Sequence, residues 1–157
     1  MKITLLVVGK TEDKYLVEGI TKYINRLKHY IGFQLVVIPE LKNTKSLTEA
    51  QQKSKEAELI LKQVNGSDVV VLLDEKGKKY KSVSFADYLN KQMIGSVQHL
   101  IFVIGGPYGF DESVYKRSNS SISLSDMTFS HQMVRLFFVE QLYRAFSILK
   151  GLPYHHE

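Results

Sequence analysis

Short apolar runs alternate with amphipathic segments along this chain, and the alternation constrains its fold more than any other feature. The apolar runs are residues 3–8, 33–38, 69–73 and 100–104. Runs of this length rich in Val, Ile and Leu predict buried strands. The segments between them, which predict helices, are residues 13–29, 47–64 and 84–93. Strands that alternate with helices indicate an α/β fold with a mainly parallel sheet flanked by helices.

The last third of the chain continues this pattern and ends in an unusually apolar helix. Residues 111–117 predict a short helix, residues 121–124 a strand and residues 125–130 a loop. In the final helix, residues 131–150, apolar side chains lie around almost the whole circumference, so every side must be buried. If one side of this helix lies on the sheet, a second subunit can cover the other side, so the pattern predicts a homodimer. Burial of the whole helix within one subunit is the alternative. The length of 157 residues is that of one domain, residues 1–157.

Charge and composition narrow the class of protein. The net charge is +5, which favours polyanionic partners such as nucleic acid, and Lys76, Lys78, Lys79 and Lys81 lie close together in a predicted basic turn. The absence of cysteine excludes disulfides and thiolate metal sites. No apolar stretch approaches the roughly 18 residues of a membrane span, and the N-terminus does not resemble a signal peptide. The expected location is therefore the cytoplasm.

The segment Gly9-Lys10-Thr11 resembles the end of a phosphate-binding P-loop but lacks the rest of it. That motif requires a glycine five residues before Gly9, and the chain has Thr4 there. The dinucleotide fingerprint also fails, since no glycine follows in Thr11 to Asp13. An ATPase and a nicotinamide-dependent dehydrogenase are therefore disfavoured.

Glycines cluster instead after the fourth predicted strand, at Gly105, Gly106 and Gly109. Glycines at the carboxyl end of a parallel strand allow a ligand to approach the backbone, although a tight turn is the simpler explanation. Leu73 and the loop from Leu124 to Phe129 also follow apolar strands. If these strands are neighbours, the three segments form a slot with apolar walls that suits an adenine ring.

The C-terminal region carries the other group of polar side chains. Glu140 and Arg144 are four residues apart, so they share a helix face; their simplest role is a surface ion pair worth about 0.3–0.5 kcal/mol. Tyr154 and His155 follow the end of the helix, where terminal residues are often disordered and idle. A metal site built from the C-terminal histidines lacks a third ligand at recognisable spacing, so no metal is expected.

Five ordered motifs then identify a family. They are FVIGGPYG at 102–109, LSDMTF at 124–129, HQMVR at 131–135, EQLYRA at 140–145 and the closing YH at 154–155. Together with the opening residues 1–10, they closely resemble the RlmH (YbeA-like) family of SPOUT methyltransferases. The resemblance spans nearly the whole chain. It departs from the family at Ser130, where proline is usual, and at His156, where lysine or arginine is usual.

The resemblance implies a fold and a cofactor site that periodicity does not reveal. The family fold is a parallel α/β sheet whose C-terminal part forms a deep trefoil knot, although knots are rare. The knot loops bind S-adenosylmethionine, the methyl donor. The positions implied to line this site are Leu73, Gly105, Gly106, Leu124, Ser125, Asp126, Met127, Thr128 and Phe129.

The implied reaction is methylation of N3 of a pseudouridine in 23S ribosomal RNA, on the assembled ribosome, by a homodimer. The N3 proton must leave, so an acceptor is needed; Glu140 and His155 are candidates, with His155 preferred because its reference pKa lies near neutrality. Tyr154 is expected to stack on the base, and Arg144 to orient Glu140 or bind phosphate. A tail that reaches the partner's pocket would complete the site. Two alternatives stay open: a non-catalytic ribosome- or RNA-binding module, and a SPOUT methyltransferase with another RNA target.

Overall fold

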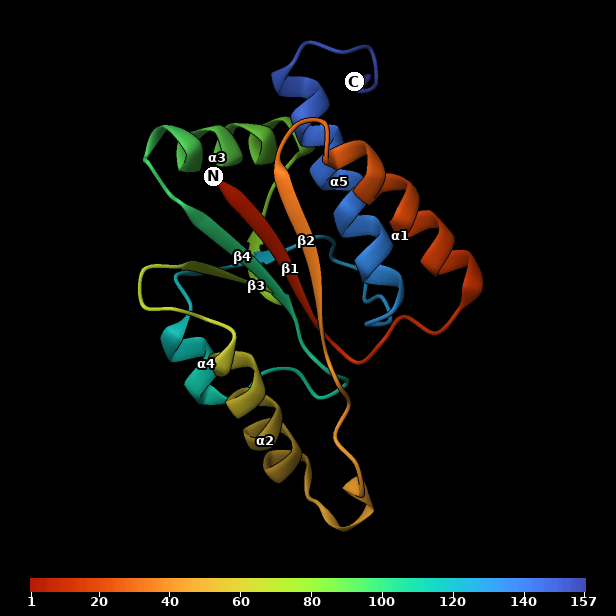
Figure 1. Ribbon diagram of the computed structural model, residues 1–157, viewed down its shortest axis with the longest axis vertical. Coiled ribbons are helices and arrows are strands. Elements are labelled where there is room, and N and C mark those ends of the chain that lie inside the picture. Colours follow the sequence, from red (N-terminus) through yellow and green to blue (C-terminus); the bar gives the residue numbers. More distant parts are fainter.

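The computed structural model describes residues 1–157 and contains one five-stranded sheet in which all strands are parallel (Figure 1). The strand order is β2-β1-β4-β3-β5. The strands are β1 (Lys2–Val8), β2 (Gly32–Ile38), β3 (Val69–Lys79), β4 (His99–Ile104) and β5 (Ser120–Ser123). The predicted α/β class and parallel sheet are therefore confirmed.

Helices cover both faces of the sheet. They are α1 (Lys14–Leu27), α2 (Glu49–Lys62), α3 (Ser82–Ile94), α4 (Glu112–Arg117) and α5 (Met133–Leu149), with a 3-10 turn, η1 (Thr44–Ser46), before α2. Along β1, Leu5 and Val7 point into a core shared with α1, α3 and α5, whereas Leu6 and Val8 point into a core shared with α2 and α4. Figure 1 shows these two groups of helices on opposite sides of the sheet. Burial on both faces explains why the strands are continuously apolar.

Local signals account for several helix boundaries. At the start of α2 the Thr48 hydroxyl accepts a hydrogen bond from the Gln51 N–H at 3.1 Å, and the Gln51 side chain accepts one from the Thr48 N–H at 2.9 Å. This reciprocal pair satisfies two backbone donors that would otherwise lack partners. Helix α4 begins similarly, with Asp111 accepting from the Ser113 N–H at 3.0 Å.

The apolar circumference of α5 is largely explained within the chain. The helix lies against the sheet and contacts both α1 and α3, and Phe138, Val139, Leu142 and Phe146 are fully buried there. Phe137 is the clear exception, with 39% of its surface exposed. Burial within one subunit therefore covers most of the helix, and only a limited apolar strip remains for a partner.

The prediction of a basic turn at residues 76–81 is wrong, because residues 76–79 belong to a strand. Strand β3 extends to Lys79, and its pairing with β5 is interrupted between Leu73 and Lys78, both of which lie opposite Ile122. The chain bulges outward between these positions and then resumes pairing with the same strand. Periodicity could not reveal this, because the second part of the strand is polar and pairs only with the edge strand β5. No helix of the fold has the length and apolar character of a membrane span.

Candidate functional site

The bulge within β3 and the loops that follow β4 and β5 border a cavity of about 650 Å³. Its walls come from Leu73 to Lys76, Ile104 to Phe110, Ile122 to Ser125 and Met127 to His131, with Lys53, Tyr115 and Val134 completing them. Because β4, β3 and β5 are adjacent, their carboxyl ends meet at one edge of the sheet. Such an edge is a usual ligand site in parallel sheets, and the volume is within the range of small-molecule pockets.

The structure brings eight of the nine predicted cofactor positions to this cavity. Those that border it are Leu73, Gly105, Gly106, Leu124, Ser125, Met127, Thr128 and Phe129. Asp126 does not border it; its exposed carboxylate pairs with Lys79 instead. The three segments that the sequence suggested as one slot are thus neighbours in space.

The two consecutive glycines pack closely against neighbouring side chains. A Cβ on Gly105 would lie 3.0 Å from the Phe110 ring, and one on Gly106 would lie 2.8 Å from both carboxylate oxygens of Glu56. Glu56 is 5% exposed, and this burial raises its pKa above the ordinary value. A side chain on Gly106 would displace the Glu56 carboxylate, so a packing neighbour is added to the close approach to the cofactor that the sequence suggested.

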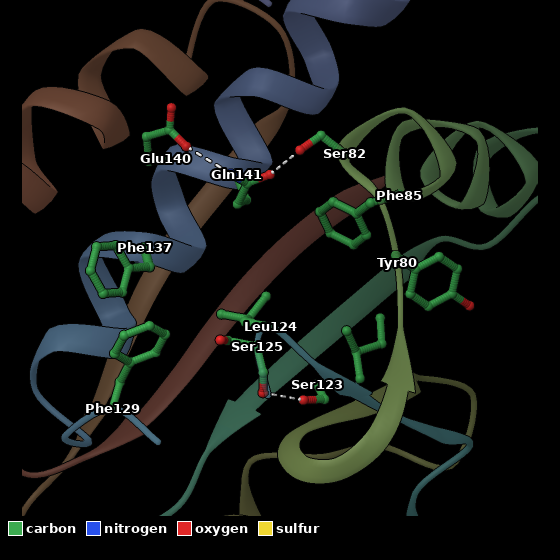
Figure 2. A pocket seen from close by; sticks show the side chains of 11 residues that line it. Tyr80, Ser82, Phe85, Ser123, Leu124, Ser125, Phe129, Phe137, Glu140 and Gln141 are labelled. Atoms are coloured by element: carbon green, nitrogen blue, oxygen red, sulfur yellow. Dashed lines mark hydrogen bonds between the residues drawn. The ribbon is translucent and has the colours of Figure 1, made fainter. Parts of the chain in front are cut away.

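A smaller cavity of about 310 Å³ adjoins the first (Figure 2). The two share Ile122 to Ser125 and Phe129 as walls. Figure 2 shows Phe129 and Phe137 on one side of this cavity and Tyr80 and Phe85 on the other. Its polar groups form a chain in which Ser82 donates to Gln141 at 2.8 Å and Gln141 donates to Glu140 at 3.1 Å.

All four predicted catalytic residues meet in one hydrogen-bonded network at the C-terminal end of α5. Arg144 donates to Glu140 at 2.5 Å, and the Tyr154 hydroxyl donates to the same carboxylate oxygen at 3.0 Å. Arg144 also lies 3.2 Å from Nδ1 of His155, with its guanidinium carbon 4.8 Å from the centre of the Tyr154 ring. The tail is therefore ordered against the helix by charged and aromatic contacts.

The network favours a defined protonation state for each member. The hydrogen bond from Arg144 to Glu140 holds the pKa of Arg144 above its usual value, so the guanidinium stays charged. Burial, Tyr23 and Glu140 together raise the pKa of Tyr154 well above that of a free phenol, so Tyr154 remains a neutral donor. Tyr23 contributes through its hydroxyl, which lies 3.2 Å from that of Tyr154.

The tautomer of neutral His155 follows from the same geometry. A guanidinium only donates hydrogen bonds, so Nδ1 of His155 must accept from Arg144 and the proton must reside on Nε2. Nε2 is buried and has no hydrogen-bond partner within the chain. His155 therefore presents an unused N–H donor rather than a free basic lone pair.

The network and the larger cavity are separate within one chain. Glu140 borders the smaller cavity, and none of the four network residues borders the larger one. No group of three or more His, Cys, Asp or Glu side chains is arranged to hold a metal ion.

Comparison with known proteins agrees with this geometry. Residues 1–155 match a family described as "Predicted SPOUT methyltransferase". The chain belongs to the SPOUT methyltransferase family. Two SPOUT relatives, both called "Ribosomal RNA large subunit methyltransferase H", come from Parabacteroides distasonis and Christiangramia forsetii. The first is 59% identical over 157 residues, all of both chains, and the second is 63% identical over 156 residues, 99% of each. The family identified from the five motifs is confirmed.

A solved structure shares this chain's fold at low sequence identity. It is that of a probable methylase family protein from Haemophilus influenzae, with a TM-score of 0.54 and 13% identity. The likeness covers 99% of this chain and 70% of the other. At this identity it supports the fold alone.

Sequence reasoning missed three polar residues of the larger SPOUT cavity. Asp74 and Glu75 border it, and Tyr115 donates a short hydrogen bond to Asp74. Burial and the Asp74 carboxylate raise the pKa of Tyr115 to about 12. Asp74 and Glu75 directly follow Leu73, so the signal was present: residues just after a buried strand lie at the ligand edge of the sheet.

Proposed function

We propose that this protein transfers a methyl group from S-adenosylmethionine to N3 of a pseudouridine in 23S ribosomal RNA, on the assembled ribosome in the cytoplasm. The observation that carries the proposal is the cavity at the carboxyl ends of three adjacent strands, in a chain that matches the SPOUT family over residues 1–155. The name shared by its full-length relatives supports ribosomal RNA of the large subunit as the substrate.

The chemistry of the larger cavity fits the methyl donor. Leu73, Leu124 and Phe129 supply apolar surface for an adenine ring, and the carboxylates of Asp74 and Glu75 suit a ligand that carries positive charge. When bound, S-adenosylmethionine supplies an electrophilic methyl group on a sulfonium. The protein's main task is then to align the target nitrogen with that group.

The remaining requirement is removal of the N3 proton, and the network geometry favours Glu140 over His155 as acceptor. The basic lone pair of neutral His155 faces Arg144, whereas Glu140 is a carboxylate on the wall of the adjoining cavity. Nε2 of His155 is buried 3.6 Å from the Glu157 carboxylate, so its N–H can donate to a carbonyl oxygen of the base, and stabilise the anion left at the imide, only once the base displaces Glu157. Arg144 orients both side chains.

We propose that the whole chain, residues 1–157, acts as one domain and works as a homodimer with a composite site. Support comes from the separation of the network and the larger cavity within one chain. Further support comes from Phe129 and Phe137, which pack together with ring centres 4.7 Å apart yet are each 39% exposed. A partner seated on this pair would bring its own network towards the cavity. A sedimentation profile of a monomer at micromolar concentration would contradict this.

The family knot is also part of the proposal. Its support is the course of β3, which leaves β5 at Leu73, bulges around it and pairs with it again at Lys78. Gly77 of this bulge packs directly on the backbone of Ile122. In a knotted chain, this bulge would form part of the loop through which the C-terminal segment is threaded.

The test is transfer of labelled methyl from S-adenosylmethionine to ribosomes that lack the modification. The matched control is Gly105→Trp, whose side chain would be directed at Phe110 and would displace that wall of the cavity. We expect labelled pseudouridine with the natural protein and none with the variant. Because a domain of 157 residues offers limited contact area to an isolated hairpin, we expect only weak, salt-sensitive activity on naked RNA. Cofactor binding without any labelling of ribosomes would refute the substrate, and equal rates on naked RNA and ribosomes would refute the need for assembly.

A further inference from the structure

We propose that Gln132 and Arg135 form a clamp that holds one end of the cavity loop, residues 125–131, against the segment after β1, and thereby sets the affinity for the methyl donor. The part that concerns the donor rests on the proposed function. The part that concerns loop order stands on geometry alone.

Arg135 is a buried cation whose hydrogen bonds all go to fixed partners. The side chain is 0% exposed, although Arg135 lies in the first turn of α5. It donates to the carbonyl oxygens of Val8 and Gly9, both at 2.8 Å, and to the Thr11 hydroxyl at 3.1 Å. Its Nε donates to the His131 carbonyl at 3.1 Å. A buried guanidinium with four acceptors joins these segments rigidly.

Gln132 closes the same contact from its outer side. Its amide oxygen accepts from the Glu12 N–H at 3.0 Å, and its amide nitrogen donates to the Lys10 carbonyl at 3.2 Å. The two side chains thus reach nearly every residue from Val8 to Glu12. The Gly9-Lys10-Thr11 segment, which lacks the rest of a P-loop, has a different role here: it is the surface on which the clamp closes.

The conformation of Gly9 is what presents these carbonyls. Its φ is +78°, which favours glycine, and a Cβ there would lie 2.5 Å from a carboxylate oxygen of Glu40. The chain therefore turns sharply at the end of β1 and directs the carbonyls of Val8 and Gly9 towards Arg135. Burial lowers the pKa of Arg135, and the nearby carboxylates of Glu40 and Glu12 oppose that effect.

The clamp matters to the cavity because the loop's other attachments outside its own segment are contacts of exposed side chains, namely Asp126 with Lys79, Thr128 with Glu75 and Phe129 with Phe137. Residues 126–130 are all exposed, and Met127 is 76% exposed. One end of the loop is fixed where the Ser123 hydroxyl donates to the Ser125 carbonyl at 2.9 Å. The other end is His131, which borders the cavity and accepts from Arg135. Release of this end would disorder the wall formed by residues 127–131.

The experiment compares Gln132→Ala with Gln34→Ala as a matched control. Gln34 also makes a side-chain hydrogen bond, to Thr4 at 3.1 Å, but borders neither cavity. Amide hydrogen exchange of the ligand-free protein measures the order of residues 125–131. Titration calorimetry with S-adenosylhomocysteine, the demethylated product, measures the affinity of the cavity.

For Gln132→Ala we expect faster exchange confined to residues 125–131 and about fivefold weaker binding of S-adenosylhomocysteine, from the loss of two partly exposed hydrogen bonds. Turnover on ribosomes at saturating methyl donor should change less than KM for the donor. Arg135→Lys, which keeps the charge but not the four-way geometry, should weaken binding further. Gln34→Ala should leave loop exchange and affinity unchanged.

Unchanged loop exchange in both clamp variants would overturn the inference, as would exchange that rises equally in the core strands. Faster loop exchange with unchanged affinity would overturn the link to ligand binding. The proposed function fails separately, if the natural protein itself does not bind S-adenosylhomocysteine. In that case loop exchange still tests the clamp.

Discussion

Replacement of Gly77 by alanine tests a close approach of the β3 bulge to the backbone of β5. Gly77 lies in the β3 bulge, and a Cβ there would lie 2.5 Å from the Ile122 nitrogen and 2.6 Å from the carbonyl carbons of Ser121 and Ile122. These are backbone atoms of β5, so no side chain can rotate away. Relief requires separation of the bulge from β5.

The size of the effect follows from what that separation would disrupt. Overpacking a well-packed interior costs about 1–3 kcal/mol even where side chains can adjust. Here the pairing of Lys78 with Ile122 and of Lys79 with Ser123 would also be lost, and each lost hydrogen bond contributes about 1 kcal/mol. We therefore expect Gly77→Ala to lower the free energy of unfolding by about 3 kcal/mol or more. Because Ile122 and Ser123 border both cavities, ligand affinity should fall as well.

Urea unfolding at one fixed protein concentration is the appropriate assay, because assembly makes stability concentration-dependent. Gly66→Ala is the matched control: a Cβ on Gly66 meets nothing within 4 Å, and its φ is not positive. We expect the control to lie within about 0.5 kcal/mol of the natural protein. A Gly77→Ala protein as stable as the control would refute the inferred contact between the bulge and β5.

Four further predictions concern titratable groups. Burial raises the pKa of Glu56, so ionisation of this carboxyl opposes folding. Glu56→Gln should therefore increase the free energy of unfolding at pH 7. Urea unfolding should show that this increase vanishes below pH 4.5. Burial and Asp74 raise the pKa of Tyr115 from 10.0 to about 12. The stabilisation by neutral Tyr115 should therefore be present below pH 10 and be lost as the pH rises towards 12. Ultraviolet titration should show that Asp74→Asn lowers the pKa of Tyr115. Glu140→Gln should slow methyl transfer by about 10²- to 10⁴-fold while S-adenosylhomocysteine affinity stays unchanged, whereas equal rates would exclude Glu140 as the proton acceptor. Tyr154→Phe, which removes one donor to Glu140, should have a smaller effect on the same rate.

Part of the candidate site could be predicted from residue order alone. Leu73, Gly105 and Leu124 each follow an apolar strand, and parallel strands place their carboxyl ends at one edge. Glu140 and Arg144 pair because they are four residues apart on a helix. Whether such a pair is more than a surface contact depends on Tyr154 and His155, whose positions after the helix no local pattern specifies.

Other residues could not be assigned from the sequence, because their surroundings come from distant segments. Asp126 lies within a predicted cofactor motif yet turns outward to Lys79. Arg135 looks like an ordinary helix-surface residue, but the left-handed turn at Gly9 supplies carbonyls that draw it inside. Gly106, in the loop after β4, lies against Glu56, a residue fifty positions earlier on α2.

The sequence by itself determined the α/β class, most element boundaries and the family. The periodicity of apolar residues indicates which side of each element is buried, and the ordered motifs indicate the family. Only the tertiary structure decided the strand order, the extension and bulge of β3, and the separation of the Glu140 network from the larger cavity. The physical reason is that these features depend on contacts between residues far apart in the chain. Gly77 against Ile122 and Arg135 against Gly9 are such contacts, and neither leaves a local pattern.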